Sequence, residues 1–322
     1  MIKTNRPAAG LLAVLAAGLS ALVALSPATA AYPDRPVVMI VGFPAGGGTD
    51  LIARGMQRAF ERALGTQLII KNVPGAAATI AATEAAGAAP DGYTLLGISN
   101  ALVIQPHRMK VNYDAKAFVP ICLVVDTPLI VFTTRTSKYK SLADVVVAAK
   151  AAPGKVPYAS PGAGSALQLG MAALDYKLGL KMKHVPFKGT SDVVQALLSG
   201  TLDVTTGQPN TIEQYDLRPL ASLSAKRLQG FESLPTVGEA TGTEVIASIW
   251  TGLFAPPGTP RAIADKLDTA CRTALADKET GDHFEKQKQP LTHLGSQEFA
   301  RFVAEDYERT RQIMEAAGLK TN

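Results

Sequence analysis

Two glycine-rich loops carry the residues whose types and spacing could bind a charged group. The first, at residues 43–50, contains Gly46, Gly47 and Gly48, followed by Thr49 and Asp50. Glycines let the backbone approach a ligand closely. We expect Thr49 or Asp50 to cap the helix that follows. Because the first turn of a helix presents N–H groups and a partial positive charge, the loop is a candidate site for a carboxylate, without any cationic side chain.

A second loop of the same kind lies further along the chain, at residues 158–165, with the sequence Tyr-Ala-Ser-Pro-Gly-Ala-Gly-Ser. A third, at 186–191, offers N–H groups and hydroxyls at another helix start, and Ser99 with Asn100 follows a predicted strand. Ligands of open parallel sheets bind beyond the carboxyl ends of the strands. These four segments therefore converge by topology, and the two glycine-rich loops can face each other across a cleft.

The residue spacing of the glycine-rich loops does not match three known functional motifs. A dinucleotide fingerprint requires a third glycine where Leu51 stands, and the Gly-Lys-Ser/Thr of a Walker A loop is missing. The G-x-S-x-G elbow of serine hydrolases surrounds neither Ser160 nor Ser165, and no histidine has a recognisable partner, so no catalytic residue is expected. When the first loop is considered alone, the alternative interpretation is a turn that binds no ligand.

Apolar runs and helical periodicity predict a β-α-β-α-β series at the start of the mature chain. Strands are expected at 36–43, 67–71 and 93–98, with helices at 51–64 and about 77–88. Such alternation indicates a parallel sheet covered by helices.

A similar series begins after residue 127. Its expected strands are 129–133, 156–158, 182–185 and 202–205, and its expected helices are 142–151, 166–178 and 191–198. A strand-like run at 248–254 then leads into three helical segments, the last at 296–317, which we expect to pack back on the first unit. The fold class is therefore α/β, with two domains that are each a mostly parallel sheet flanked by helices. Domain 1 is expected to contain 32–127 and 248–322, and domain 2 to contain 128–247, with hinge-like connections.

Residues 1–31 show the three parts of a secretory signal: basic residues, an apolar run at 10–25, and a small-residue stretch. Cleavage is expected after Ala30 or Ala31. A transmembrane anchor is disfavoured because the run is short, Ala-rich and followed at once by a cleavage-type site. We therefore expect the signal to be removed and the mature protein to be periplasmic.

The amino-acid composition indicates which classes of molecule the protein is expected to bind. The 322 residues are 47% hydrophobic, enough to bury the cores of two domains. The formal net charge is +5, and loss of Lys3 and Arg6 with the signal leaves +3. Because basic residues are spread along the chain and do not form a stripe, no nucleic-acid partner is expected.

The sulfur and imidazole side chains give no sign of a metal or redox centre. Cys122 and Cys271 each lie among apolar residues without a nearby metal-type or redox-type partner. We therefore expect two separate buried thiols and no disulfide. The four histidines are far apart in sequence and form no metal-binding pair, so neither a metal nor another cofactor is expected.

Short motifs in order along nearly the whole mature chain carry a family resemblance. They are Tyr32-Pro33-Asp34-Arg35-Pro36, Phe43-Pro44 with Gly46-Gly47-Gly48-Thr49-Asp50, Asn72 with Pro74-Gly75-Ala76, Pro90-Asp91-Gly92-Tyr93-Thr94-Leu95-Leu96, Pro153-Gly154-Lys155 with Tyr158-Ala159-Ser160, Val185-Pro186-Phe187-Lys188-Gly189 and Ala255-Pro256-Pro257-Gly258-Thr259-Pro260. Together they resemble the Bug family, the periplasmic receptors of tripartite tricarboxylate transporters.

The resemblance implies a two-domain Venus-flytrap fold of the periplasmic-binding-protein type, which closes on its ligand. It implies that main-chain amides, hydroxyls and waters hold a carboxylate, and that the ligand is a di- or tricarboxylate, an acidic amino acid or an aromatic acid. The contact residues that it implies are Phe43, Gly46, Gly47, Thr49, Asp50, Ser160, Ala163, Gly164, Ser165, Gly189 and Thr190. The implied partners are a small organic acid and a membrane permease, and the protein is expected to be a monomer.

The sequence departs from the common family pattern at positions that concern specificity. Asp is frequent where Gly207 stands, His where Gln168 stands, Asn where Ala163 stands and Arg where Val73 stands. Lost polarity at Ala163 and Gly207 predicts a wider, more neutral cleft that suits a bulkier acid. Delivery of solute to a permease is the leading interpretation; the alternatives are a ligand-reporting partner of a sensor kinase and, third, a hydrolytic enzyme.

Overall fold

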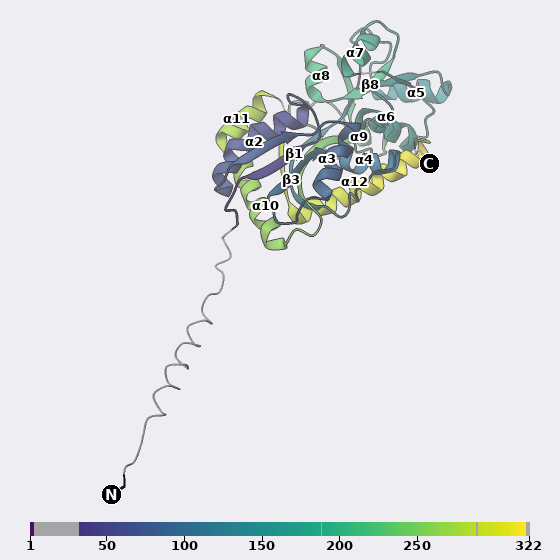
Figure 1. Cartoon of the computed structure of the whole chain (residues 1–322). Helices are drawn as coiled ribbons and strands as arrows, with labels where there is room; N and C mark the ends of the chain where they lie inside the picture. The colour runs from purple at the N-terminus through teal and green to yellow at the C-terminus, as the bar shows by residue number, and fades with distance from the viewer. Residues whose placement is uncertain (3–31, 188, 288, 320–322) are drawn as a thin grey trace.

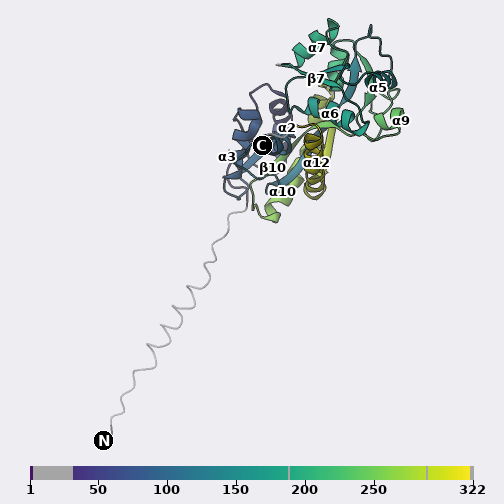
Figure 2. The ribbon, with the colours of Figure 1, turned by 90° about the vertical axis from the view of Figure 1, so that its right-hand side faces the viewer.

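The chain folds into two β-sheets with helices packed on their faces (Figure 1). This computed structural model describes residues 1–2, 32–187, 189–287 and 289–319, so most of the predicted signal lies outside the described residues. We call the six-stranded sheet with its helices the first lobe, and the five-stranded sheet with its helices the second lobe. Figure 2 shows the second lobe above the first, with α12 reaching from one to the other.

The first lobe has the strand order β11-β4-β10-β3-β1-β2. Its strands are β1 (Val37–Val41), β2 (Leu68–Asn72), β3 (Thr94–Ser99), β4 (Val119–Pro128), β10 (Ser248–Ala255) and β11 (Leu291–Gly295). Its helices are α2 (Gly48–Leu64), η1 (Ala76–Ala78), α3 (Thr79–Ala86), α4 (Ala101–Arg108), α10 (Arg261–Leu275), α11 (Lys278–Lys286) and α12 (Ser296–Ala316). β1 is parallel to β2 and β3, whereas β10 is antiparallel to β3 and β4, and β11 to β4.

The second lobe has the strand order β7-β6-β8-β5-β9. Its strands are β5 (Ile130–Thr133), β6 (Pro157–Ser160), β7 (Lys183–Pro186), β8 (Val204–Gly207) and β9 (Arg218–Ser222), and its helices are α5 (Leu142–Ala151), α6 (Ala166–Lys177), α7 (Thr190–Leu198), α8 (Pro209–Gln214) and α9 (Val237–Thr241). β6 is parallel to β7 and β8, and β5 is antiparallel to β8 and β9. Each sheet is thus parallel at one end, and both glycine-rich loops leave strands of these parallel ends.

Helix α2 illustrates how the sequence builds the frame of the first loop. Ile52, Met56 and Phe60 recur at four-residue spacing and are buried against the sheet. Gly65 ends the helix with φ 82°, and its N–H donates to the carbonyl of Glu61. The amphipathic pattern therefore fixes which face of α2 is buried, and because α2 follows β1, its N-terminus lies beyond the carboxyl end of that strand.

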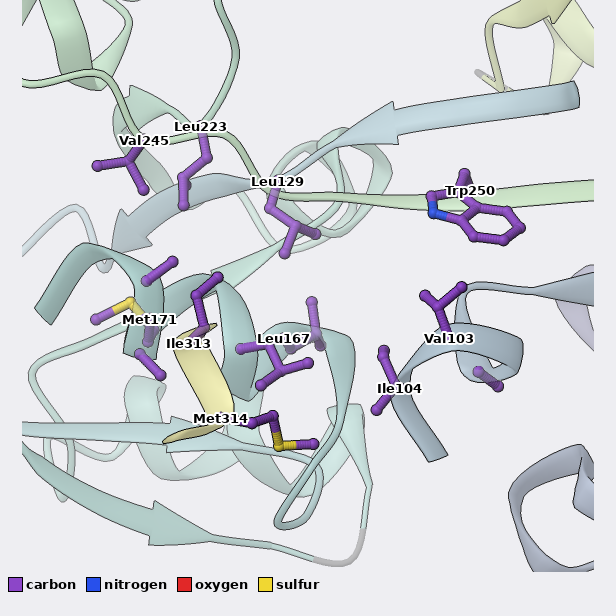
Figure 3. Close-up of a cluster of buried hydrophobic side chains, with 14 of the residues drawn as sticks. Val103, Ile104, Leu129, Leu167, Met171, Leu223, Val245, Trp250, Ile313 and Met314 are labelled. Carbon is purple, nitrogen blue, oxygen red and sulfur yellow. The ribbon is translucent and has the colours of Figure 1, made fainter. Parts of the chain in front are cut away.

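The chain crosses between the lobes at two places, and α12 packs on both lobes. Leu129 alone separates β4 from β5, and the chain returns through α9 to β10. α10 and α11 pack on α2, as expected for the C-terminal helices, but α12 contacts both α4 and α6. Figure 3 shows Leu167 and Met171 of α6 beside Ile313 and Met314 of α12. One hydrophobic core therefore continues from the first lobe into the second on this face.

The expectation of two separate thiols is wrong, because a disulfide joins Cys122 to Cys271. Cys122 lies on β4 and Cys271 on α10, and both are buried in the same apolar cluster of the first lobe. The two residues are 149 positions apart. Their apolar surroundings correctly indicate burial, but only the packing of α10 on β4 brings the two sulfurs together.

Candidate functional site

The first glycine-rich loop is held in shape by the buried carboxylate of Asp50, which is 1% exposed. One of its oxygens accepts hydrogen bonds from the N–H of Gly46 (2.8 Å) and from Nε of Arg54 (2.9 Å), and the other accepts from Nδ2 of Asn72 (2.8 Å). Burial alone would raise the pKa of this carboxyl, but the hydrogen bonds from Arg54, Gly46 and Asn72 hold it below its ordinary value. Asp50 therefore stays ionised and shapes the loop.

The N-terminus of α2 has no side-chain cap, contrary to our expectation for Thr49 or Asp50. The N-cap residue is Gly47, and no side chain hydrogen-bonds the first turn. Asp50 lies inside the helix and reaches back to Gly46, one residue before the cap. The first-turn N–H groups of α2 are therefore left for a ligand or water.

Ser99 is the last residue of β3, the strand beside β1, and Asn100 follows it at the start of α4, so both lie at the same edge as the first loop. Asn100 is buried, and its Nδ2 donates to the carbonyl of Ser248 at 3.0 Å while its N–H donates to that of Trp250. Asn100 thus ties β3 to β10. Ser99 is partly exposed at this edge.

The second glycine-rich loop is held by a chain of neutral hydrogen bonds. The N–H of Gly164 donates to Oε1 of Gln168 (2.5 Å), and Nε2 of Gln168 lies 3.1 Å from Nδ1 of His184. The other nitrogen of His184, Nε2, lies 2.7 Å from Oγ of Ser160, which donates to the carbonyl of Gly162 (2.9 Å). Because Gln168 accepts from Gly164, its amide NH₂ faces His184, so Nδ1 must accept and Nε2 must carry the proton.

His184 is therefore neutral in this arrangement. Burial lowers the pKa of its imidazole below the ordinary value. The ring of Tyr158 packs beside it with centroids 5.1 Å apart, and burial raises the pKa of that phenol to about 12, so Tyr158 is also neutral. We call Gly164, Gln168, His184 and Ser160 the neutral relay.

The pairing of Ser160 with His184 corrects the sequence-based expectation that no histidine has such a partner, but it is not a nucleophile with its base. The hydroxyl proton of Ser160 goes to the carbonyl of Gly162, so His184 donates to Ser160 instead of accepting from it. Ser160 is fully buried, and the group that orients His184 is the neutral amide of Gln168. A hydrolase would need the opposite proton direction and an accessible oxygen.

Ser165 caps α6. Its Oγ accepts from the N–H of Gln168 (3.2 Å) and donates to the carbonyl of Gly162 (2.8 Å). Gly164 has φ +75°, a conformation that favours glycine. Ala163 is exposed at the tip of the loop.

The third loop lies next to the second because β7 pairs with β6, with Pro186 opposite Ser160. Gly189 is the N-cap residue of α7, which has no side-chain cap, and Thr190 is its exposed first residue. Of the two helix starts that follow these loops, that of α6 is therefore capped by Ser165, and that of α7, at Gly189 and Thr190, has no side-chain cap.

One contact joins the second loop to the first lobe. A Cβ placed on Gly164 would lie 2.5 Å from Cδ of Arg108, at the end of α4. Helix α4 begins directly after Ser99 and Asn100. In the part of the chain that the structure describes, no hydrogen bond or ion pair connects the loop at 43–50 with the loop at 158–165. The predicted residues thus form two groups, one per lobe, with α4 reaching from one group to the other.

Gly207 does not widen the cleft as its missing side chain suggested. The residue is buried, and a Cβ there would lie 2.7 Å from the ring of Phe132. Phe132 already fills this space, so the missing side chain leaves no extra volume at this position.

Sequence reasoning did not identify Arg54, Arg108 and His184 as residues that contact the loops. Arg54 stands four residues after Asp50, a helical spacing that brings the two side chains together and could have revealed the pair. No comparable local signal exists for Arg108 or His184, whose contacts depend on tertiary packing.

Neither a bilayer-spanning helix nor a metal-binding cluster occurs in the described ranges. None of the described helices has the length and hydrophobicity to cross a membrane. Among the same residues, no three His, Cys, Asp or Glu side chains are placed to hold a metal ion.

Known proteins share this architecture. Residues 52–319 match the family described as the tripartite tricarboxylate transporter family receptor. Protein BugT of Bordetella pertussis is 32% identical over 322 residues, which cover 96% of this chain and 98% of the relative. A TctC solute binding protein from Polaromonas has a TM-score of 0.81 at 27% identity and covers 88% of this chain and 99% of its own.

Two similar structures hold organic acids. An R. palustris protein with adipate has a TM-score of 0.73 at 26% identity and covers 89% of this chain and 98% of its own. MatC from Rhodopseudomonas palustris with bound malate has a TM-score of 0.69 at 28% identity and covers 88% and 99%.

Proposed function

Because the chain belongs to the family of tripartite tricarboxylate transporter receptors, we propose that it captures a small carboxylate-bearing compound between its lobes and delivers it to the membrane permease of such a transporter. Members and structural neighbours of this family are solute-binding proteins, and this chain is likewise a binding protein and not an enzyme. The proposal includes a periplasmic, monomeric receptor with domain boundaries at residues 127/128 and 247/248.

The observation that carries the proposal is that each lobe has, at one of its predicted contact loops, a helix start without a side-chain cap. α2 and α7 both begin at a glycine without a side-chain cap, so each leaves first-turn N–H groups for an anion. α2 begins beyond the end of β1. α7 begins after β7, which pairs with β6, so its start lies beside the neutral relay at the end of β6. Closure of the lobes would bring these two sets of donors to one ligand.

A ligand with two acidic ends suits this arrangement. One carboxylate would meet the first-turn amides of α2, beside Phe43, Gly46, Gly47 and Thr49, and the other would meet Ala163, Gly164, Gly189 and Thr190. Structural neighbours hold adipate and malate, which are both dicarboxylates. We therefore place this protein's ligand among dicarboxylates, with tricarboxylates, acidic amino acids and aromatic acids as the wider class.

The test begins with the compound that co-purifies with the mature protein, identified by mass spectrometry after denaturation. Calorimetry with that compound and with malate, adipate and terephthalate then measures affinity, and small-angle scattering measures closure. We expect one acid to bind and to make the particle more compact, without being turned over. Chemical conversion of the acid, or failure of every acid to bind, would contradict the proposal.

A deletion strain separates transport from signalling. Uptake of the bound acid should be lost in the strain and restored by the intact gene. If uptake persists while transcription in response to the acid is lost, the protein reports its ligand to a sensor instead of delivering it.

A further inference from the structure

Arg108, the last residue of α4, places a guanidinium group of the first lobe against the second glycine-rich loop. A Cβ built on Gly164 would lie 2.5 Å from Cδ, 2.8 Å from Nε and 3.4 Å from Cζ of this arginine. Because Gly164 has no side chain, the guanidinium can lie close to the backbone of the loop. Arg108 therefore stands where the two lobes meet, beside a residue that is predicted to contact the ligand.

The end of α4 that carries Arg108 is held in place by its neighbours. His107 is buried, its Nε2 lies 3.2 Å from the carbonyl oxygen of Tyr307 on α12, and the two rings have centroids 4.3 Å apart. Figure 3 shows Ile104 of α4 and Leu167 of α6, which belong to the core that continues between the lobes. Arg108 itself is partly buried. Its backbone is therefore fixed, and its side chain extends from a rigid support.

The guanidinium of Arg108 has no acceptor among the residues that the structure describes. Within those ranges, no hydrogen bond and no ion pair involves its side chain. Arg54, at the first loop, differs because its Nε donates to Asp50 at 2.9 Å. A guanidinium carries five N–H donors and stays charged throughout the physiological range. Arg108 is therefore free to donate to an acceptor that enters with the ligand.

The charges around the two loops leave that of Arg108 uncompensated. At the first loop, Asp50 and Arg54 form an ion pair and cancel each other. At the second loop, the neutral relay contributes no charge, because His184 is neutral. A ligand with a single carboxylate can be held by the first-turn amides of α2. A second negative charge on the same ligand needs a further positive charge, and Arg108 supplies one.

The geometry of a guanidinium also suits this second carboxylate better than it suits a neutral group. Its planar donors match the two oxygens of a carboxylate, and such pairs are stronger than hydrogen bonds between neutral groups. A neutral amide or hydroxyl at the same place would leave the charge of Arg108 unpaired. The arginine therefore favours ligands that carry two acidic groups over ligands that carry one.

We propose that Arg108 determines the specificity of this protein for dicarboxylates, by binding the carboxylate that lies at the second glycine-rich loop. This inference rests on the proposed function, since it concerns the second acidic group of the same ligand. Arg108 belongs to the first lobe but acts at the loop of the second. The carboxylate that it binds therefore contacts both lobes, and this contact favours the closed state.

Three symmetric dicarboxylates and their monoamides test this role on the mature protein: succinate with succinamate, adipate with adipamate, and terephthalate with 4-carbamoylbenzoate. Each monoamide keeps the shape of its parent acid and lacks one charge. Calorimetry measures the affinities, and ¹⁵N NMR follows the side-chain Nε–H signal of Arg108. We expect a dicarboxylate that fits the site to bind about ten- to a hundredfold more tightly than its monoamide, and to shift this signal.

Substitutions of Arg108 separate its charge from its position in the helix. In Arg108→Gln, the affinity for the dicarboxylate should fall about ten- to a hundredfold, whereas that for the monoamide should change little. Arg108→Lys keeps the charge without the planar fork and should retain part of the preference. Arg272→Gln is the matched control, because Arg272 also lies in the last turn of its helix, α10. This control should bind both compounds as the wild type does.

The outcomes distinguish this inference from the proposed function. A preference for the dicarboxylate that survives in Arg108→Gln, or an Nε–H signal that the bound dicarboxylate leaves unchanged, would overturn the role of Arg108 while the protein remains a receptor for acids. Equal losses of affinity for the dicarboxylate and its monoamide would show that Arg108 only supports the fold of the site. Failure of the wild-type protein to bind any of the six compounds would contradict the proposed function and this inference together.

Discussion

The two glycine-rich loops look alike in sequence but are stabilised by different electrostatics. An ionised carboxylate, Asp50, holds the first through Gly46, Arg54 and Asn72. The second depends on the neutral relay, in which His184 must keep one nitrogen unprotonated. A low pKa at Asp50 keeps the first loop intact throughout the neutral range, whereas the second loop depends on an imidazole that must stay neutral, the form that burial favours by lowering the pKa of His184. Two loops of similar sequence can thus differ in their sensitivity to acid.

The lobes that carry these loops also differ in covalent support. The first contains the Cys122–Cys271 disulfide, and with both cysteines there, none is left for the second. The first lobe is assembled from two distant stretches of chain, whereas the second sheet comes from one continuous stretch. The disulfide therefore lies in the lobe that is built from two separate stretches of the chain.

Removal of the disulfide should have the largest effect. Cys122→Ala combined with Cys271→Ala should lower the free energy of unfolding by about 2–5 kcal/mol, because the bond closes a long loop of the unfolded chain. Calorimetry measures the loss, and hydrogen exchange should locate it in the first lobe. A melting temperature that reductant and the double substitution both leave unchanged would contradict the bond.

Gly164→Val should have the next largest effect, because φ is +75° there and the added Cβ meets Arg108. We expect the affinity for the cognate acid to fall by at least about tenfold, equivalent to 1.4 kcal/mol. Gly179→Val is the matched control, since φ is +62° and no atom lies within 4 Å of its Cβ. Equal loss of affinity in both variants would mean that backbone strain, and not the position of the loop against α4, is responsible.

Ser165→Ala should weaken binding less, since its hydroxyl already serves as a helix cap. Loss of a cap costs about 1 kcal/mol, so we expect about fivefold lower affinity from the loosened loop. Ser141→Ala removes the cap of α5 in the same lobe and should cost similar stability without changing affinity. If the two variants bind alike, Ser165 has no specific role at the site.

The smallest effect is a pH dependence of the second loop. The pKa of His184 is lowered in the folded protein, so below about pH 6.5 the unfolded chain takes up the proton more readily, and stability falls until the folded protein is also protonated. A proton on Nδ1 would face the NH₂ of Gln168 and release Gly164. We expect the affinity for the acid to stay constant above about pH 6.5 and to fall severalfold once the pH is below the lowered pKa of His184.

His184→Gln tests that origin, because the variant cannot titrate. Its affinity should be lower at every pH but should lack the decrease below pH 6.5. A decrease of the same size in the variant would assign the pH dependence to another group of the protein or to the ligand itself.

Local sequence patterns predicted the parallel ends of both sheets, because strands such as β1 and β6 are followed by glycine and then by a periodic helix. They did not predict β4, whose apolar run contains Pro120 and Asp126, or the short helix α4. The two glycine-rich loops were predicted as strand-to-helix connections, since glycine and hydroxyl residues identify helix starts, and their role in binding stays a prediction. The relay between Gln168 and His184 and the disulfide were missed because each needs contacts between elements distant in sequence.

The position of β10 has a consequence for the order in which the protein can be assembled. This strand lies between β3 and β4, although the whole second lobe is synthesised before it. A nascent chain that has emerged only as far as β9 possesses every strand of the second sheet, while the first sheet still has a gap at its centre. The first sheet is therefore completed only when β10 has been synthesised, whereas the second lobe can form earlier, while the chain is still being elongated.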